Sequence, residues 1–217
     1  MNSLVKLGSF LGALSFAAIV AIGYHQKTEV DYINSHQPPT ITQIQNDVVA
    51  FETDSGSVCS GWVDSRTGKI NTAAHCFEFA AGEHEAIVHF NDGTTEIWKT
   101  DYVTTTDDPK SDFATLVPRD KDSKHRNGLK VCTFKPYYGE KIVVMGAPLG
   151  VEKSMSFGWV GNPEVSGLIE VDVKILPGNS GGPVIDIETG CVLGQAEMIY
   201  TANYAEDYGV NFATPVK

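Results

Sequence analysis

From residue 46 to its C-terminus, the chain alternates strand-sized apolar runs with short turn signals, and this rhythm restricts the folds open to it. The runs cover residues 48–51, 86–90, 113–117, 142–145, 168–175, 192–193 and 210–213. Turn signals such as Asn91-Asp92-Gly93 and Glu188-Thr189-Gly190 separate them, as in hairpin-connected sheets. No amphipathic period of helix length follows residue 45, so the pattern predicts an all-β sandwich or barrel. One helical turn is expected around residues 73–77.

Length and charge exclude several classes of protein. The chain has 217 residues, enough for a single domain once an export segment and a spacer are set aside. Its formal net charge is -11 and it has no dense Lys/Arg cluster. A nucleic-acid-binding protein normally carries a basic patch, so nucleic acid is a poor candidate partner.

The first 23 residues are typical of a targeting segment. Lys6 precedes an apolar run from about residue 7 to residue 21, which ends in the loose cleavage-site match Ala21-Ile22-Gly23. The run is long for a signal peptide and barely long enough to span a membrane, so a cleaved signal peptide and a retained anchor both remain open. Either predicts an exported protein, periplasmic or extracellular, that contacts a membrane only through this segment. Residues 24–45 are polar and predict a spacer before a domain at 46–217.

Four cysteines in an apparently exported chain fit two disulfides: Cys59, Cys76, Cys132 and Cys191. Four cysteines allow three pairings, and the spacing alone does not choose among them. Zinc binding is the competing use, but the chain has no CxxC motif and no pair of histidines at ligand spacing. We therefore expect no metal and no other cofactor.

Two segments carry the residue types that nucleophilic catalysis needs. One is Thr72-Ala73-Ala74-His75-Cys76, and the other is Pro177-Gly178-Asn179-Ser180-Gly181-Gly182-Pro183-Val184. A serine among glycines suits a nucleophile, because Gly permits the dihedrals that free the hydroxyl and let nearby N–H groups converge on one point. The hydroxyl also needs a base, and histidine has the side-chain pKa nearest neutrality. Ser180 and His75 are therefore the candidates.

The base in turn needs a carboxylate to fix its tautomer, and Asp112 stands directly before the apolar run 113–117. Asp92, Asp107 and Asp108 compete with it. Asp92 precedes a glycine and is better explained by a hairpin turn. Asp107 and Asp108 precede Pro109 in a segment typical of a loop. The other histidines have no motif around them and are interpreted as structural or solvated: His25, His36, His84, His89 and His125.

Taken together, these segments resemble the trypsin-like serine proteases, and among them the HtrA-type bacterial branch. TAAHC resembles that family's general-base motif, GNSGGPV its nucleophile motif, and DFATLV its aspartate followed by a strand. The chain order His75, Asp112, Ser180 matches as well. Residues 146–150 and 209–215 resemble two late HtrA-type strands, so the likeness runs from about residue 46 to the C-terminus.

The resemblance implies two antiparallel β-barrels, at about 46–125 and 126–217, with the active site between them. It also implies a serine endopeptidase that cleaves exported or extracellular polypeptides through an acyl-enzyme. The N–H groups of Gly178 and Ser180 would form the oxyanion hole. The PDZ module usual in HtrA-type enzymes is not expected after residue 215. The alternative is a catalytically silent peptide-binding module, but such modules usually lose a triad member and here all three are present.

The same resemblance implies a bond between Cys59 and Cys76, which would leave Cys132 and Cys191 for a second pair. It also implies that activity needs no zymogen cleavage. In the branch activated by proteolysis, an Asp before the nucleophile pairs with the new N-terminal ammonium. Here Asn179 holds that position, and an amide has no charge to pair with an ammonium.

Primary specificity depends on which branch guides the alignment. An HtrA-type pocket would be lined by Ile175, Ala196, Glu197 and Met198 and would favour a small or medium apolar residue. A trypsin-like alignment instead places Lys174 at the pocket floor, which would favour an acidic residue. We prefer the apolar pocket, because Asp172 and Lys174 alternate with Val171, Val173 and Ile175, as solvent-facing residues of a half-buried strand do.

Overall fold

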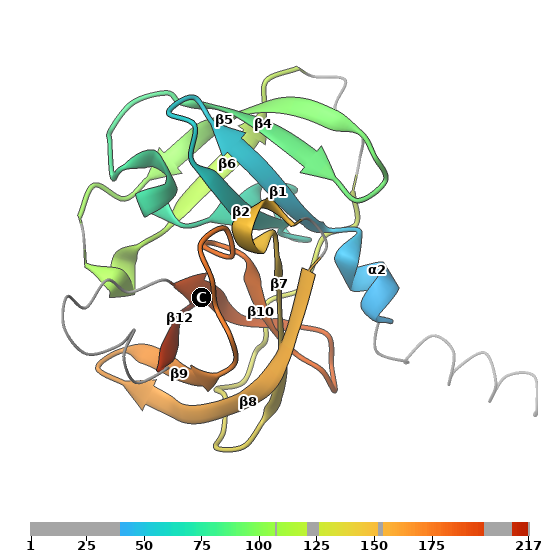
Figure 1. Ribbon diagram of the computed structural model, residues 1–217, viewed down its shortest axis with the longest axis vertical. Helices are drawn as coiled ribbons and strands as arrows, with labels where there is room; N and C mark the ends of the chain where they lie inside the picture. The colour runs from blue at the N-terminus through green and yellow to red at the C-terminus, as the bar shows by residue number, and fades with distance from the viewer. Residues whose placement is uncertain (1–39, 107, 121–125, 152–153, 198–209, 217) are drawn as a thin grey trace, which may run out of the picture. The chain divides into compact units, whose positions relative to one another are not determined.

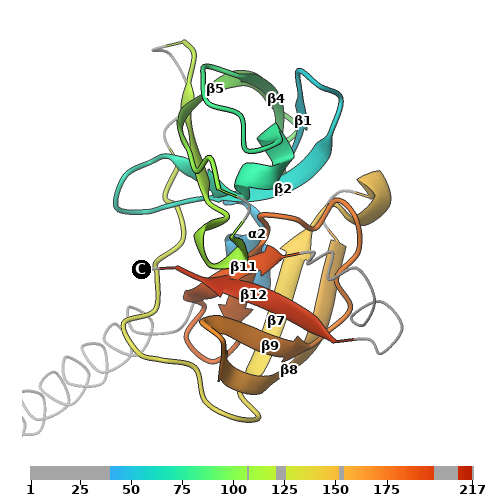
Figure 2. The same ribbon diagram turned by 90° about the vertical axis from the view of Figure 1, so that its left-hand side faces the viewer.

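The computed structural model describes residues 40–106, 108–120, 126–151, 154–197 and 210–216. Their strands form two closed antiparallel barrels of six strands each, as Figures 1 and 2 show. The predicted all-β, two-barrel fold is therefore confirmed. The expected export segment, most of the expected spacer and Met198 lie outside the described residues.

The first barrel has the strand order β1-β2-β3-β6-β5-β4. Its strands are β1 (Val48–Thr53), β2 (Val58–Val63), β3 (Ile70–Thr72), β4 (Glu85–Phe90), β5 (Thr95–Val103) and β6 (Ala114–Pro118). The second barrel has the order β10-β11-β12-β9-β8-β7. Its strands are β7 (Lys141–Gly146), β8 (Ser154–Val165), β9 (Leu168–Asp172), β10 (Pro183–Asp186), β11 (Val192–Glu197) and β12 (Asn211–Pro215).

The hairpin of β4 and β5 shows how the sequence pattern produces these barrels. Along β4, Ala86, Val88 and Phe90 are buried, and the residues between them are more exposed, as period-2 alternation requires. Gly93 at the hairpin tip has a φ of 83°, a conformation that glycine adopts without strain. Asp92 Oδ1 accepts a hydrogen bond from the backbone N–H of Thr94 at 2.9 Å, which fits its predicted place in a turn.

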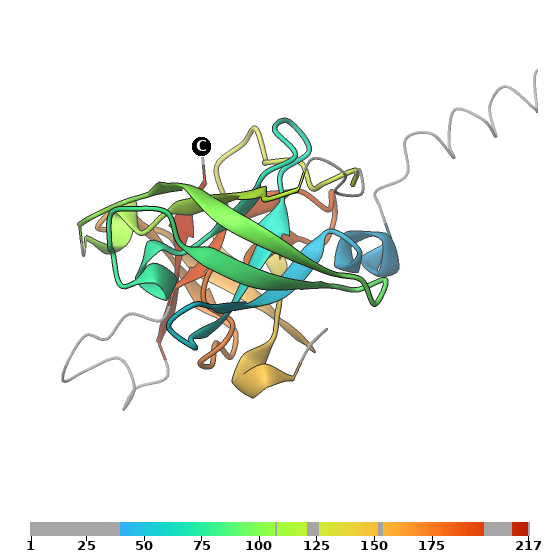
Figure 3. The ribbon, with the colours of Figure 1, turned by 90° about the horizontal axis from the view of Figure 1, so that it is seen from above.

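Each barrel has its own apolar core, and a third cluster joins the two. This third cluster packs Trp62 of β2 against Val143 and Met145 of β7. It also includes Ile44 of a short helix, α2 (Ile41–Gln45), which is seen at one side of the domain in Figure 3. Thr40 begins this helix with a capping box to Gln43. The end of the stretch expected as a spacer is thus packed against the barrels.

The remaining described helices are short 3-10 turns: η1 (Ala74–Phe77), η2 (Pro109–Ser111) and η3 (Pro148–Gly150). The first of them confirms the helical turn expected near residue 75. No helix in the described part of the chain is long and apolar enough to cross a membrane.

Two disulfides are present, Cys59–Cys76 and Cys132–Cys191, so both expected pairings are confirmed. The first joins β2 to η1 inside the first barrel. The second ties the segment before β7 to the residue that precedes β11. Closing the loop between Cys59 and Cys76, which are 17 positions apart, is worth roughly 3 kcal/mol if chain entropy dominates.

Candidate active site

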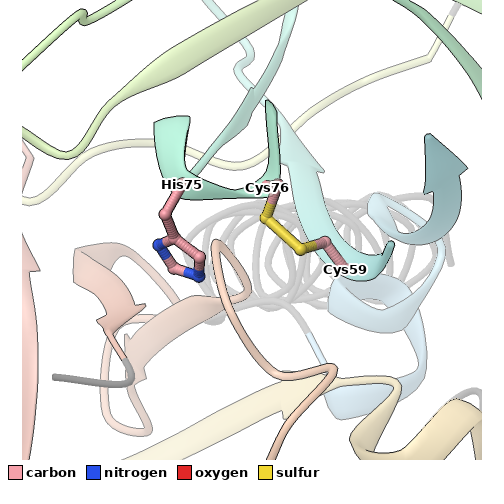
Figure 4. A group of neighbouring side chains, drawn as sticks. All are labelled: Cys59, His75 and Cys76. Atoms are coloured by element: carbon pink, nitrogen blue, oxygen red, sulfur yellow. A yellow bond between two sulfur atoms is a disulfide. The ribbon is translucent and has the colours of Figure 1, made fainter. Parts of the chain in front are cut away.

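His75 lies in the turn η1, immediately after β3. Ala73 and Ala74 before it are fully buried, which lets the chain turn tightly against the first barrel. The disulfide of Cys76 to Cys59 holds the other side of the turn, and Figure 4 shows the imidazole of His75 leaving the turn beside this disulfide, toward the second barrel. Local chain geometry and one covalent bond thus position the predicted base.

Asp112 lies directly against His75 and makes two hydrogen bonds with it. Nδ1 of His75 is 2.5 Å from Oδ2 of Asp112, and the backbone N–H of His75 donates to Oδ1 at 2.8 Å. Because an ionised carboxylate only accepts hydrogen bonds, Nδ1 carries a proton, and Nε2 is the ring nitrogen that can exchange a proton with a nucleophile. Asp112 is only 1% exposed, and its backbone oxygen accepts a hydrogen bond from Gln195 of β11.

This contact shifts both pKa values. Burial raises the pKa of Asp112, but its hydrogen bonds with His75 outweigh that effect and bring the pKa to about 2. Burial lowers the pKa of His75, and the bond with Asp112 overrides it, so the net pKa of the imidazole is raised. Asp112 is therefore ionised over the physiological range and stabilises the imidazolium form of His75.

The glycines of the nucleophile segment are required by close packing. A Cβ on Gly181 would lie 2.2 Å from Oγ1 of Thr72, and one on Gly178 would lie 2.2 Å from the backbone oxygen of Ala147. Both residues also have positive φ angles, 78° and 97°. The loop that carries Ser180 therefore sits against the end of β3, three residues before His75.

Ser180 itself is 3% exposed, far less than a glycine-rich turn suggests. The reason is that its backbone oxygen accepts a hydrogen bond from the N–H of Ser60 at 2.9 Å, which seats the loop against β2. Within the described residues, no hydrogen bond joins the hydroxyl of Ser180 to His75. Such bonds often tighten only when substrate binds.

Ser60 is a site residue that sequence reasoning missed. It is fully buried in β2, and its hydroxyl donates to the backbone oxygen of Gly178 at 2.6 Å while accepting from the N–H of Ala147 at 2.9 Å. Its backbone oxygen accepts from the hydroxyl of Thr72 at 2.7 Å. One serine thus fastens the nucleophile loop, β3 and the loop after β7 together. The Cys59-Ser60-Gly61 run of small residues in a strand was the only local hint.

Two backbone N–H groups near Ser180 are available for a ligand. Across the part of the chain that the structure describes, the N–H groups of Gly178 and Ser180 donate to no protein acceptor. The carbonyl of Pro177 accepts from the N–H of Leu149 at 2.7 Å, which orients the peptide joining Pro177 to Gly178. Two such donors, two residues apart, suit an oxygen that gains negative charge during a reaction.

Glu197 brings a second carboxyl group to His75. Its Oε1 is 3.4 Å from Nδ1 of His75, and its Oε2 accepts a hydrogen bond from the hydroxyl of Thr214 at 2.9 Å. Glu197 is 5% exposed. Burial raises its pKa to about 8, and the adjacent carboxylate of Asp112 also acts in this direction, against the lowering effect of His75. Sequence reasoning assigned Glu197 only to the substrate pocket.

The other expected pocket residues are placed as follows. Ile175 and Ala196 belong to the core cluster of the second barrel, and Met198 lies outside the described residues. Asp172 and Lys174 are exposed, whereas Val171, Val173 and Ile175 are buried, so the expected alternation is present. The backbone of Ala196 bonds to the N–H of Gly181 and the carbonyl of Gly182. The main-chain groups of Ala196 are therefore already paired within the chain.

Among the described side chains, two groups consist of residue types that can bind a metal ion. In the first, Cys59 and Cys76 are joined as a disulfide and cannot act as thiolate ligands beside His75. In the second, the His75 nitrogen that faces Asp112 and Glu197 is already hydrogen-bonded to Asp112. A disulfide explains why the first group is close together, and the hydrogen bond between His75 and Asp112 explains the second.

Comparison with known families decides the class of the protein. The trypsin-like peptidase domain family matches residues 59–194, well over half of the chain. The chain belongs to the trypsin-like peptidase family. The matched range includes both the turn of His75 and the loop of Ser180.

Curated relatives of this trypsin-like peptidase are named probable periplasmic serine endoproteases, DegP-like. The relative from Hahella chejuensis is 34% identical over 170 residues, covering 75% of this chain and 34% of its own length. The relative from Pseudomonas fluorescens is 32% identical over 170 residues, covering 75% and 33%. The chain thus spans about a third of the length of these relatives.

A solved structure supports the fold independently. The crystal structure of the serine endoprotease from Yersinia pestis superposes with a TM-score of 0.64 at 21% identity, covering 82% of this chain and 63% of that one. At this identity the likeness concerns the fold alone. It confirms the two-barrel architecture of the trypsin-like peptidases.

Proposed function

We propose that this chain is a serine endopeptidase in which Ser180 is the nucleophile, His75 the general base and Asp112 the residue that orients the base. The observation that carries the proposal is the double hydrogen bond between Asp112 and His75. It leaves Nε2 of His75 free as a base beside a loop with a family nucleophile motif. Family membership supports the same reading.

In the proposed reaction, Nε2 of His75 takes the proton of the Ser180 hydroxyl as its oxygen attacks the peptide carbonyl. The imidazolium then protonates the leaving amine, which produces an acyl-enzyme. A water molecule activated by the same nitrogen hydrolyses this ester. Asp112 stabilises the imidazolium in both halves of the reaction, in line with the raised pKa of His75.

The N–H groups of Gly178 and Ser180 would bind the oxyanion of each tetrahedral intermediate. Each such donor is typically worth about 3 kcal/mol of transition-state stabilisation. Their lack of a protein acceptor among the described residues supports this role. The hydrogen bonds of Ser60 to Gly178 and of Leu149 to Pro177 would keep the hole in shape before substrate arrives.

Substrates would be exported polypeptides bound as an extended strand. The two disulfides fit an oxidising compartment, and the DegP-like relatives are named periplasmic. The proposed primary pocket holds a small or medium apolar side chain near Ile175 and Ala196. The exposure of Lys174 supports this apolar pocket over an acidic specificity.

Labelling with a fluorophosphonate probe tests the mechanism and the silent-module alternative together. The wild-type protein should react covalently at Ser180, and Ser180→Ala should neither react nor hydrolyse a peptide. Ser65→Ala changes an exposed serine of the β2–β3 hairpin and serves as the matched control. Peptide hydrolysis that persists in pure Ser180→Ala would refute the mechanism, and no labelling of folded wild type would favour the silent module.

A further inference from the structure

The proposed triad uses one carboxylate, yet two buried carboxyl groups face the same imidazole. One ring nitrogen of His75 and one oxygen each of Asp112 and Glu197 all lie within 4.8 Å of one another. Glu197 reaches this position from β11, and Gln195 on the same face of that strand bonds the backbone of Asp112. One strand of the second barrel thus holds both the main chain and the side chain of Asp112.

Two adjacent buried carboxylates repel one another, so only one of them is ionised at neutral pH. Asp112 is the ionised member, because it accepts both hydrogen bonds from His75. Glu197 has a hydroxyl donor on Oε2 and no direct bond from the backbone of His75. The pKa values diverge accordingly, low for Asp112 and high for Glu197.

We propose that Glu197 is a positioning residue of the catalytic site: as an un-ionised carboxylic acid it donates a hydrogen bond to Asp112 and holds that carboxylate against His75. The hydroxyl of Thr214 already occupies Oε2, which leaves Oε1 to carry the acid proton toward Asp112. The inference rests on the triad proposed above and adds a fourth member to it.

The arrangement makes activity sensitive to alkaline pH. Among the described residues, the titratable groups that face Glu197 are His75 of η1 and Asp112 before β6, and β12 contributes only the uncharged Thr214. When Glu197 loses its proton, the hydrogen bond to Asp112 becomes a repulsion. The repulsion displaces the Asp112 carboxylate from Nδ1 of His75, so the base loses the contact that orients it and stabilises its imidazolium in the transition state. Activity is therefore expected to fall as pH rises through the pKa of Glu197.

The test compares the pH profile of kcat/KM for wild type and Glu197→Gln. A glutamine amide can still donate to Asp112 and accept from Thr214 but cannot ionise. We expect Glu197→Gln to stay within about threefold of wild type near neutral pH, since it mimics the acid form. One pH unit above the transition, wild type should have lost about tenfold of its plateau value, while the variant keeps its plateau.

Glu140→Gln is the matched control. Glu140 is another buried carboxyl of the second barrel, 1% exposed, whose pKa is raised by burial, but it bonds to the backbone of Tyr137 and not to the triad. This substitution should leave the pH profile of activity unchanged. Its result separates a specific effect at His75 from a general effect of removing a buried acid.

Glu197→Ala distinguishes positioning from substrate binding. Loss of positioning should lower kcat at least tenfold with KM nearly unchanged, whereas a pocket role would raise KM at constant kcat. The proposal is overturned by an alkaline limb that persists in Glu197→Gln. It is also overturned by a folded Glu197→Gln that loses activity at neutral pH, or by an effect of Glu197→Ala on KM alone. Failure of the triad itself would appear separately, as activity that survives in Ser180→Ala.

Discussion

Ser60 is the most informative residue to change, because a single oxygen atom links the two barrels at the nucleophile loop. Ser60→Ala removes the hydroxyl that donates to Gly178 at 2.6 Å and accepts from the N–H of Ala147 at 2.9 Å. All of these groups lie in the buried junction. The substitution therefore leaves one backbone carbonyl and one backbone N–H without their partner.

The cost follows from the number of groups left unsatisfied. A buried polar group without a partner costs about 1–3 kcal/mol, so two of them amount to roughly 2–6 kcal/mol. A domain of this kind has a total stability of about 5–15 kcal/mol, so the variant should still fold. Because Gly178 is a proposed oxyanion donor, its displacement by even part of an ångström should lower kcat by about tenfold to a hundredfold.

Urea unfolding of Ser60→Ala at neutral pH gives the stability change, and hydrolysis of a chromogenic peptide gives kcat and KM. Ser65→Ala at the exposed hairpin tip is the control and should change neither. A folded Ser60→Ala with unaltered kcat would show that this serine stabilises the junction without shaping the oxyanion hole. A stability loss below about 0.5 kcal/mol would refute the account of the buried groups themselves.

The remaining predictions concern acid stability, the first disulfide and the N-terminus. Asp112 has a pKa of about 2 in the folded protein, against the ordinary 3.8. Its ionisation should therefore contribute about 2 kcal/mol to the free energy of unfolding. This contribution is present above pH 4 and is lost as pH falls through 2. Urea unfolding of wild type and Asp112→Asn between pH 4 and pH 2 tests this prediction, because the variant should lack this pH-dependent loss of stability. Replacing Cys59 and Cys76 together by Ala should cost roughly 3 kcal/mol of unfolding free energy, and a loss well under 1 kcal/mol would contradict the loop-entropy estimate. Versions of the protein that start at different points between residues 24 and 39, upstream of α2, each with an N-terminal tag, should be equally active, because Asn179 carries no charge for a new ammonium. Activity confined to one untagged N-terminus would disprove this.

The sequence by itself determined the features that depend on neighbouring residues. Alternation of buried and exposed positions predicted strands such as β4, and Asn91-Asp92-Gly93 predicted the turn that follows it. The two motifs around His75 and Ser180 predicted the family, since each is a contiguous run of residues that can be identified without knowing what it packs against. One local signal was overlooked: Thr40 and Gln43 form a capping box that begins α2, a helix too short to show an amphipathic period.

Only the tertiary structure decided which residues support the site from a distance. Ser60 bonds to Gly178 across 118 positions, and Gln195 bonds to Asp112 across 83. The family resemblance assigned Glu197 to the substrate pocket, and no pattern in the sequence tells what lies opposite its face of β11. The strand order of each barrel and the packing of one barrel on the other set those partners. A carboxyl group brought beside Asp112 in this way has a pKa that no local pattern encodes.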